Sequence, residues 1–135
     1  MKKWLVHFPW IAYSGFIFYL SSQQKLDVPD LHFNLQDKVF HFLAFTLYGI
    51  FVSLSVLNWP AKWLEKLNWM RVAAVIGIIY GFLDEIHQYF VPGREMDIWD
   101  WVADSLGVLT GILILKFFSG NNRLASLLNY LFPKN

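Results

Sequence analysis

Acidic residues recur through the chain at the spacing of a helical repeat. Residues three or four positions apart lie on one face of an α-helix. Asp97, Asp100 and Asp104 follow this spacing, so their carboxyl groups would share one face. Asp84 and Gln88, four positions apart, would share a face of an earlier helix. Carboxyl groups that meet between helices can act as general acids or bases, or bind a cation.

A histidine belongs to the same pattern. His41 follows Asp37 by four residues. The complete acidic set contains Asp37, Asp84, Glu85, Asp97, Asp100 and Asp104. The basic residues near it are Lys38 and Arg94, and six ionised carboxylates cannot share a low-dielectric pocket with two cations. We therefore expect neutral carboxyl groups, a protonated histidine, or a bound divalent cation such as magnesium, manganese, calcium or zinc, although no HExxH-type motif identifies a metal.

Helix capping is the alternative explanation for part of this set. Asp37 and Asp97 would be N-caps, and Asp100 would be a first-turn acid favoured by the helix dipole. Asp84 and Glu85 approach the C-terminal end of their helix, where acidic residues are unfavourable. We therefore interpret these two residues as functional.

The elements that carry these residues are predicted to be membrane-spanning helices. The 135 residues are 56% hydrophobic and 16% charged, a balance that excludes a disordered chain and disfavours an ordinary soluble enzyme. Long apolar segments satisfy their backbone in lipid as helices. The four segments that approach the required length are 4–20, 39–57, 72–91 and 98–118. We expect a single domain over residues 1–135, an all-α integral membrane bundle of four transmembrane helices.

Two terminal features complete this prediction. The apolar face of Leu124–Phe132 has helical spacing but is too short to span, which predicts a short C-terminal amphipathic helix on the membrane surface. The first apolar segment follows Lys2 and Lys3, as a signal peptide would. Because no small-residue cleavage site follows it, we expect it to be retained.

Glycines extend two of the acidic stripes. Gly77 and Gly81 precede the acids of the third predicted helix, and Gly107 and Gly111 follow those of the fourth. Small residues four positions apart allow helices to approach closely. We expect the third and fourth predicted helices to pack on each other through these glycines, with their carboxyl groups in the outer half of the membrane.

The distribution of basic residues predicts the orientation. Eight of the 11 lysines and arginines fall on the side of the two termini, so the positive-inside rule places both termini in the cytoplasm of a multi-pass cell-membrane protein. Nine of the 10 acidic residues fall on the opposite, outer side. The net charge of +1 gives no basic field for nucleic acid, and the absence of cysteine excludes disulfides and thiolate chemistry.

Three motifs together resemble the VanZ-like family of membrane proteins. Residues 37–45 read DKVFHFLAF and resemble the family's DKxxHFxxF, and residues 84–94 read DEIHQYFVPGR and resemble DExxQxFxPGR. Residues 100–111 resemble DxxxNxxGxxxG, with Asp104 where the family more often has asparagine, and residues 21–23 resemble a weaker element. The resemblance implies a small integral membrane protein. It also implies a link to low-level resistance to teicoplanin, a glycopeptide that attacks lipid-anchored wall precursors.

Three classes of function fit these residues. The first is an envelope enzyme that acts on a lipid-linked or anionic headgroup at the outer leaflet. The second is a non-catalytic accessory module that binds an envelope lipid or the antibiotic. The third is a proton- or cation-coupled transporter, for which four helices would need a homo-oligomer. The expected partners are membrane lipids and a lipid-linked envelope precursor, with no nucleic acid, and whether the protein is an enzyme stays open.

The residues divide between two roles in the enzyme reading. The candidate catalytic residues are Asp37, His41, Asp84 and Glu85. The candidate substrate-binding residues are Lys38, Gln88, Arg94, Asp100 and Asp104. Asp84 or Glu85 would be a general base or metal ligand, His41 a proton partner, and Arg94 a clamp for the headgroup.

Overall fold

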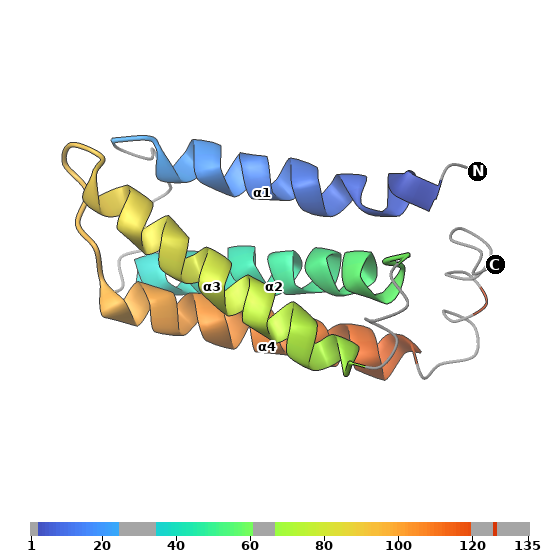
Figure 1. The fold of residues 1–135 in the computed structure, drawn as a ribbon. Helices are drawn as coiled ribbons and strands as arrows, with labels where there is room; N and C mark the ends of the chain where they lie inside the picture. The colour runs from blue at the N-terminus through green and yellow to red at the C-terminus, as the bar shows by residue number, and fades with distance from the viewer. Residues whose placement is uncertain (1–2, 25–34, 61–66, 120–125, 127–135) are drawn as a thin grey trace.

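The described part of the chain folds into four long helices (Figure 1). The computed structural model describes residues 3–24, 35–60, 67–119 and 126. A short 3₁₀ helix, Lys3–Val6, precedes α1. The long helices are α1 (Phe8–Ser21), α2 (Gln36–Leu57), α3 (Trp69–Tyr89) and α4 (Ile98–Ser119). The predicted all-α class is therefore confirmed over these residues.

Neighbouring helices in the chain run in opposite directions. In Figure 1, α2 and α4 lie side by side and parallel, and α3 crosses them obliquely. The helix α1 lies on the side of α2 that is away from α4. His7, just before α1, bonds through Nδ1 to Ser55 Oγ near the end of α2 at 2.7 Å. Ser22, just after α1, bonds to His87 Nε2 near the end of α3 at 2.9 Å. The starts of α2 and α4 thus share one end of the bundle with the ends of α1 and α3, and we call this the acidic end.

Two of the four helices meet the length and composition of a membrane span. These are α2 and α4. The 14 residues of α1 rise about 21 Å, which is shorter than the roughly 30 Å hydrocarbon core. Both acidic residues of α3, Asp84 and Glu85, lie in its last two turns together with His87 and Gln88. The predicted set of four spans is thus supported for two helices, and the predicted C-terminal amphipathic helix lies outside the described residues except for Ser126.

The outward surface of the bundle is apolar on every long helix. Ile11, Leu43, Leu83 and Leu113 come from the four helices in turn, and each is more than half exposed. Soluble monomers rarely present apolar surface of this extent. Contact of these side chains with lipid would remove them from water.

Local sequence signals explain where the last two helices begin. The side chain of Asn68 accepts a hydrogen bond from the Met70 N–H at 2.9 Å, which caps α3. Asp97 Oδ1 accepts from the Trp99 N–H at 2.8 Å, which caps α4 in agreement with the alternative explanation for this residue. Between these helices Gly93 has φ +81°, a conformation that favours glycine and allows the tight turn.

Glycines bring α4 against α2. A Cβ atom at Gly107 would overlap the carbonyl oxygen of Phe42, and one at Gly111 would overlap that of Thr46. Gly49 of α2 lies in the same contact, against the backbone of α4. The absence of three side chains therefore lets these two backbones touch.

The expected partner of the α4 glycines was wrong. Gly107 and Gly111 contact α2, whereas Gly77 and Gly81 of α3 do face α4 as expected. The stripe that contains Gly107 also carries the acids of α4, and those acids bind basic residues of α2. The whole stripe therefore turns toward α2.

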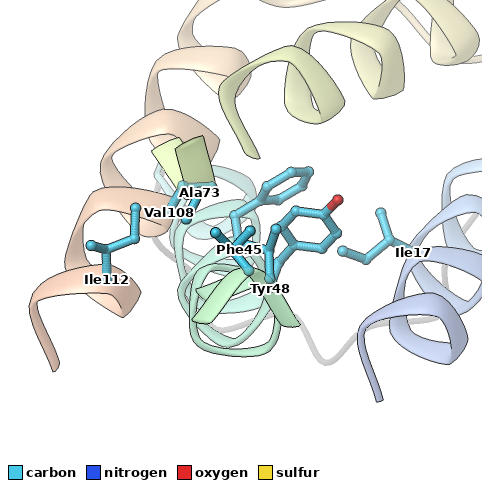
Figure 2. Packing of buried hydrophobic residues seen from close by; sticks show 8 residues of the cluster. Ile17, Phe45, Tyr48, Ala73, Val108 and Ile112 are labelled. Atoms are coloured by element: carbon cyan, nitrogen blue, oxygen red, sulfur yellow. The ribbon is translucent and has the colours of Figure 1, made fainter. Parts of the chain in front are cut away.

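The apolar core lies between the helices beyond the acidic end (Figure 2). Phe45 and Tyr48 of α2 are 1% exposed and pack beside Val108 of α4 and Ile17 of α1. The ring of Tyr48 stacks on that of Tyr80 of α3 with centroids 4.7 Å apart. This core fixes the three helices that hold the polar residues.

Candidate functional site

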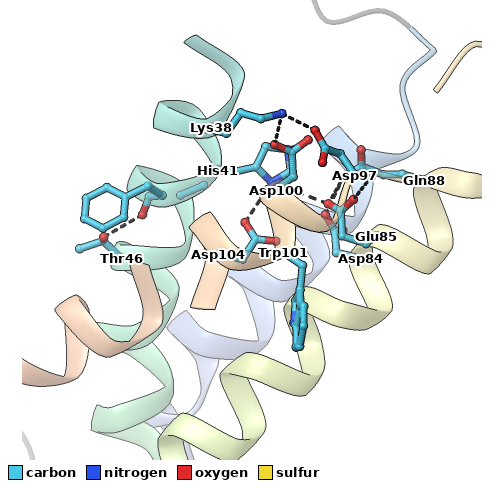
Figure 3. A network of polar contacts seen from close by, with 12 residues as sticks. Lys38, His41, Thr46, Asp84, Glu85, Gln88, Asp97, Asp100, Trp101 and Asp104 are labelled. Carbon is cyan, nitrogen blue, oxygen red and sulfur yellow. Dashed lines mark hydrogen bonds and ion pairs between the residues drawn. The ribbon is translucent and has the colours of Figure 1, made fainter. Parts of the chain in front are cut away.

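His41 is the centre of a polar cluster between α2, α3 and α4 (Figure 3). Its Nδ1 atom lies 2.9 Å from Asp104 Oδ1 of α4 and 3.9 Å from Glu85 Oε1 of α3. Its Nε2 atom lies 4.0 Å from Asp100 Oδ2. Glu85 and Asp104 are fully buried, and Asp100 is 4% exposed. One imidazole ring therefore faces three buried carboxyl groups from two helices.

The glycine contact between α2 and α4 sets the distance from His41 to Asp104. Gly107 lies three residues after Asp104 on the same face of α4. It meets the backbone of Phe42, the residue that follows His41. The close approach of the backbones thus places a short acidic side chain within hydrogen-bond reach of the histidine.

Lys38 joins the starts of α2 and α4. Its Nζ atom lies 2.5 Å from Asp97 Oδ2 and 2.8 Å from Asp100 Oδ1. The hydrogen bond from Lys38, and then that from the Trp99 N–H, lower the pKa of Asp97 below its ordinary value. Asp97 is therefore both a helix cap and an ion-pair partner, and Lys38 is held by two carboxylates.

Asp37 is not a helix cap, which corrects the capping interpretation. The helix α2 begins at Gln36 with Leu35 at the N-cap position, so Asp37 falls within the first turn. The hydrogen bond of His41 goes to Asp104 across the helix contact. Asp37 nevertheless offers an oxygen within 4.8 Å of ligand atoms of His41 and Asp100.

A chain of hydrogen bonds connects the turn before α4 to the acids of α3. The guanidinium of Arg94 donates to the side-chain oxygen of Gln88. Gln88 Nε2 in turn donates to Asp84 Oδ2 at 3.0 Å and to Glu85 Oε1 at 3.4 Å. Glu85 Oε2 accepts from the backbone N–H of Asp97 at 3.0 Å. The orientation of both α3 carboxyl groups is thus fixed by neighbours that carry N–H donors.

A cavity of about 570 Å³ opens at the acidic end beside this cluster. The predicted site residues that line it are Asp37, His41, Asp84, Gln88, Arg94 and Asp100. These side chains therefore lie around one cavity, while their roles stay predictions. The remaining predicted residues, Lys38, Glu85 and Asp104, lie behind the lining and bond to residues that form it.

The part of the lining that α1 and the residues after it contribute was not predicted. Ile17, Leu20 and Ser21 of α1 and Gln24 beyond it line the cavity together with polar residues of α2 and α4. The weak motif at residues 21–23 was the one signal near this part of the lining. Apolar residues of a lipid-facing helix carry no pattern that distinguishes a cavity wall from a lipid contact.

Two overlapping groups of side chains at this end could hold a metal ion. One contains Asp37, His41 and Asp100, and the other contains His41, Glu85 and Asp104. In each group the ligand atoms lie within 4.8 Å of one another. Carboxylate and imidazole donors suit divalent ions, and the same groups could also transfer a proton.

Comparison with known proteins gives one family. A family model described as VanZ/LLP1 matches residues 4–119, a range that contains every candidate site residue and nearly all of the helical structure. Searches of curated proteins and of solved structures give no match.

Proposed function

Because the chain belongs to the VanZ/LLP1 family, we propose that it is a multi-pass membrane protein of the cell envelope with both termini in the cytoplasm. The apolar outward faces of all four long helices support this placement. The excess of lysine and arginine on the side of the termini supports the orientation. The acidic end then lies at the outer leaflet.

We further propose that the cavity takes the headgroup of a lipid-linked envelope precursor. The observation that carries this proposal is the mixed lining of the cavity, which includes both apolar and polar side chains. Ile17, Leu20 and Phe45 would contact the hydrocarbon next to the headgroup, while Arg94 would contact the headgroup itself. An arginine fork matches a phosphate or carboxylate group. The volume also falls in the range of about 300–1,000 Å³ that small-molecule sites occupy.

Binding of a lipid-linked precursor in the cavity would affect susceptibility to teicoplanin, because that glycopeptide attacks lipid-anchored wall precursors. A protein that holds or alters such a precursor at the outer leaflet would change how much of it the drug can reach. The proposal therefore predicts a shift in the drug's inhibitory concentration when the protein is expressed, and loss of that shift when the cavity is disabled.

Lipid binding by purified protein tests the headgroup proposal. We would measure binding of phosphatidic acid and of phosphatidylcholine to the full chain in detergent by native mass spectrometry. The wild type should prefer the phosphate monoester, and Arg94→Ala should lose that preference. Lys116→Ala removes the same charge from an exposed position at the other end of α4 and should keep it. The proposal would be contradicted if wild type and Arg94→Ala showed the same preference for phosphatidic acid. It would also be contradicted if Arg94→Ala and Lys116→Ala lost that preference equally.

The buried carboxyl groups favour a chemical step over simple capture. A site that only holds a lipid would not need three carboxyl groups around one histidine, because buried charges are unfavourable without partners. Asp84→Asn keeps the shape of a cavity-lining residue and removes its charge. If the step is chemical, this variant should bind the lipid but lose the teicoplanin phenotype. If the protein only captures lipid, both should persist.

A further inference from the structure

One oxygen of Asp104 has no hydrogen-bond partner within the described residues, although the residue is fully buried. Oδ1 bonds to His41, but Oδ2 is unsatisfied. An unsatisfied buried polar atom costs roughly 1–3 kcal/mol, and a charged one more. Native structures contain few such atoms, and each calls for a physical explanation.

The free oxygen points toward α3, where the side chain of Glu85 lies. A Cβ atom at Gly81 would be 3.3 Å from Asp104 Oδ2, so this oxygen faces the gap that Gly81 leaves. Gly81 and Glu85 are four residues apart on one face of α3. Asp104 Oδ2 and the Glu85 carboxyl group therefore face a common region between the two helices.

The charge in this region is not balanced by the described side chains. Glu85 and Asp104 are fully buried, and among the described residues His41 is the one basic group within 4.0 Å of them. Lys38 is paired with Asp97 and Asp100, and Arg94 bonds to Gln88. If both carboxyl groups are ionised, even a protonated His41 would leave one carboxylate charge uncompensated. A bound cation would remove both the charge excess and the unsatisfied oxygen.

The donor atoms lie close to the separations that a metal site needs. His41 Nδ1 is 2.9 Å from Asp104 Oδ1 and 3.9 Å from Glu85 Oε1, and one atom from each residue falls within 4.8 Å of the others. Two ligands of a tetrahedral Zn²⁺ ion, each about 2.1 Å from the metal, are roughly 3.4 Å apart. Small side-chain movements would therefore complete the geometry.

The surroundings also hold the ligands in place. The second oxygen of Glu85 accepts from the Asp97 N–H, which directs Oε1 toward His41. Asp100 Oδ2 lies 4.0 Å from His41 Nε2, so it would have to move closer to orient a metal-bound imidazole by a hydrogen bond. Hydrogen bonds of this kind orient the ligands in metal sites.

We propose that the chain binds a first-row divalent cation, Mn²⁺ or Zn²⁺, through His41 Nδ1, Glu85 Oε1 and Asp104. One imidazole and two carboxylates, without thiolates, suit these ions. The alternative group with Asp37 and Asp100 is less suitable, because Asp100 is already paired with Lys38 and Asp37 is exposed. This site lies beside the headgroup cavity, but ion binding can be established whether or not the cavity takes a lipid.

Mn²⁺ titration of the purified full chain in detergent tests the site. In electron paramagnetic resonance, the decrease of the free Mn²⁺ signal should show one ion bound per chain. The spectrum of the bound Mn²⁺ should show nitrogen coupling from the imidazole. Asp104→Asn should weaken binding at least about tenfold, since even outer-shell changes cost about 10–100-fold. This variant matches the residue that the family pattern more often has, so we expect it to fold. Glu85→Gln is the second ligand variant.

Glu95→Gln is the matched control, because it removes an exposed carboxyl group that belongs to neither of the two candidate metal groups. It should bind Mn²⁺ as the wild type does. Mn²⁺ should also raise the melting temperature of the wild type and of Glu95→Gln, but not that of Asp104→Asn. Failure of the wild type to bind Mn²⁺, bound Mn²⁺ without nitrogen coupling, or undiminished binding in Asp104→Asn would overturn the assignment. The lipid-binding measurement is separate, so failure of either proposal can be recognised alone.

Discussion

Lys38 is a predicted substrate-binding residue whose contacts within the protein bear on that prediction. Its position in the first motif predicted a substrate contact. The structure instead places its ammonium group between Asp97 and Asp100, where it joins two helix starts. A basic side chain that is bound twice by the protein would have to leave one partner to reach a ligand. Arg94, which lines the cavity and bonds to an amide, is better placed for that role.

The Lys38–Asp97 pair predicts a pH dependence of stability. The lowered pKa of Asp97 means that its charged form is favoured in the folded state. Its contribution is therefore present above the ordinary aspartate pKa of about 3.9, and is lost as pH falls through the lowered pKa of the folded protein. Melting temperatures in detergent should fall more steeply below pH of about 4 for the wild type than for Asp97→Asn.

Glu95→Gln is the control for this titration. It removes a neighbouring exposed carboxyl group and leaves both Lys38 contacts in place. We expect it to keep the pH profile of the wild type. If the melting temperature of Asp97→Asn depends on pH as that of the wild type does, the ion pair does not contribute to stability.

At the scale of the elements, the sequence predicted where helices lie better than which helices meet. The apolar segment 39–57 and α2 (Gln36–Leu57) differ by three residues at one end. Spacing also showed correctly that Asp100, Asp104 and Gly107 share one face of α4. Spacing cannot say which neighbour that face contacts, because the periodicity of one helix contains no information about its partner. The contact with α2 therefore required the structure.

The α2–α4 contact predicts a large effect from one methyl group. Gly107→Ala would place a Cβ atom against the carbonyl oxygen of Phe42, where the backbone cannot move aside easily. Overpacking of this kind costs about 1–3 kcal/mol, and separation of the helices would also lengthen the bond between His41 and Asp104. The melting temperature should fall, and binding of Mn²⁺ by the cluster should weaken with it.

Gly15→Ala provides the comparison within the same protein. A Cβ atom at Gly15 of α1 meets nothing within 4 Å, so the substitution should be neutral or slightly stabilising, because alanine is the better helix former. Equal melting temperatures for Gly107→Ala and the wild type would show that the glycine contact is not required.

At the scale of the whole molecule, the separation of polar and apolar groups gives the bundle a direction. The buried acids gather at the acidic end, while the core of Phe45, Tyr48 and Val108 begins beyond them. In a membrane this arrangement makes the cavity accessible from one side. The polar residues that line the cavity were predictable from their spacing. The residues that α1 contributes were not, because their place in the lining depends on how an otherwise lipid-facing helix packs.

The two sides can be distinguished by cysteine labelling, since the chain contains no cysteine of its own. Glu95→Cys introduces a thiol at an exposed position of the turn between α3 and α4, and Leu67→Cys introduces one at an exposed position before α3. If the termini are cytoplasmic, a membrane-impermeant maleimide should label position 95 in intact cells and position 67 only after permeabilisation. The reason is the positive-inside rule, which acts on the basic residues near the termini and between α2 and α3.

Both variants must first label fully in detergent, which confirms that each thiol is reactive. The reverse pattern in intact cells would place the acidic end in the cytoplasm, and a cavity there could not receive a headgroup from the outer leaflet.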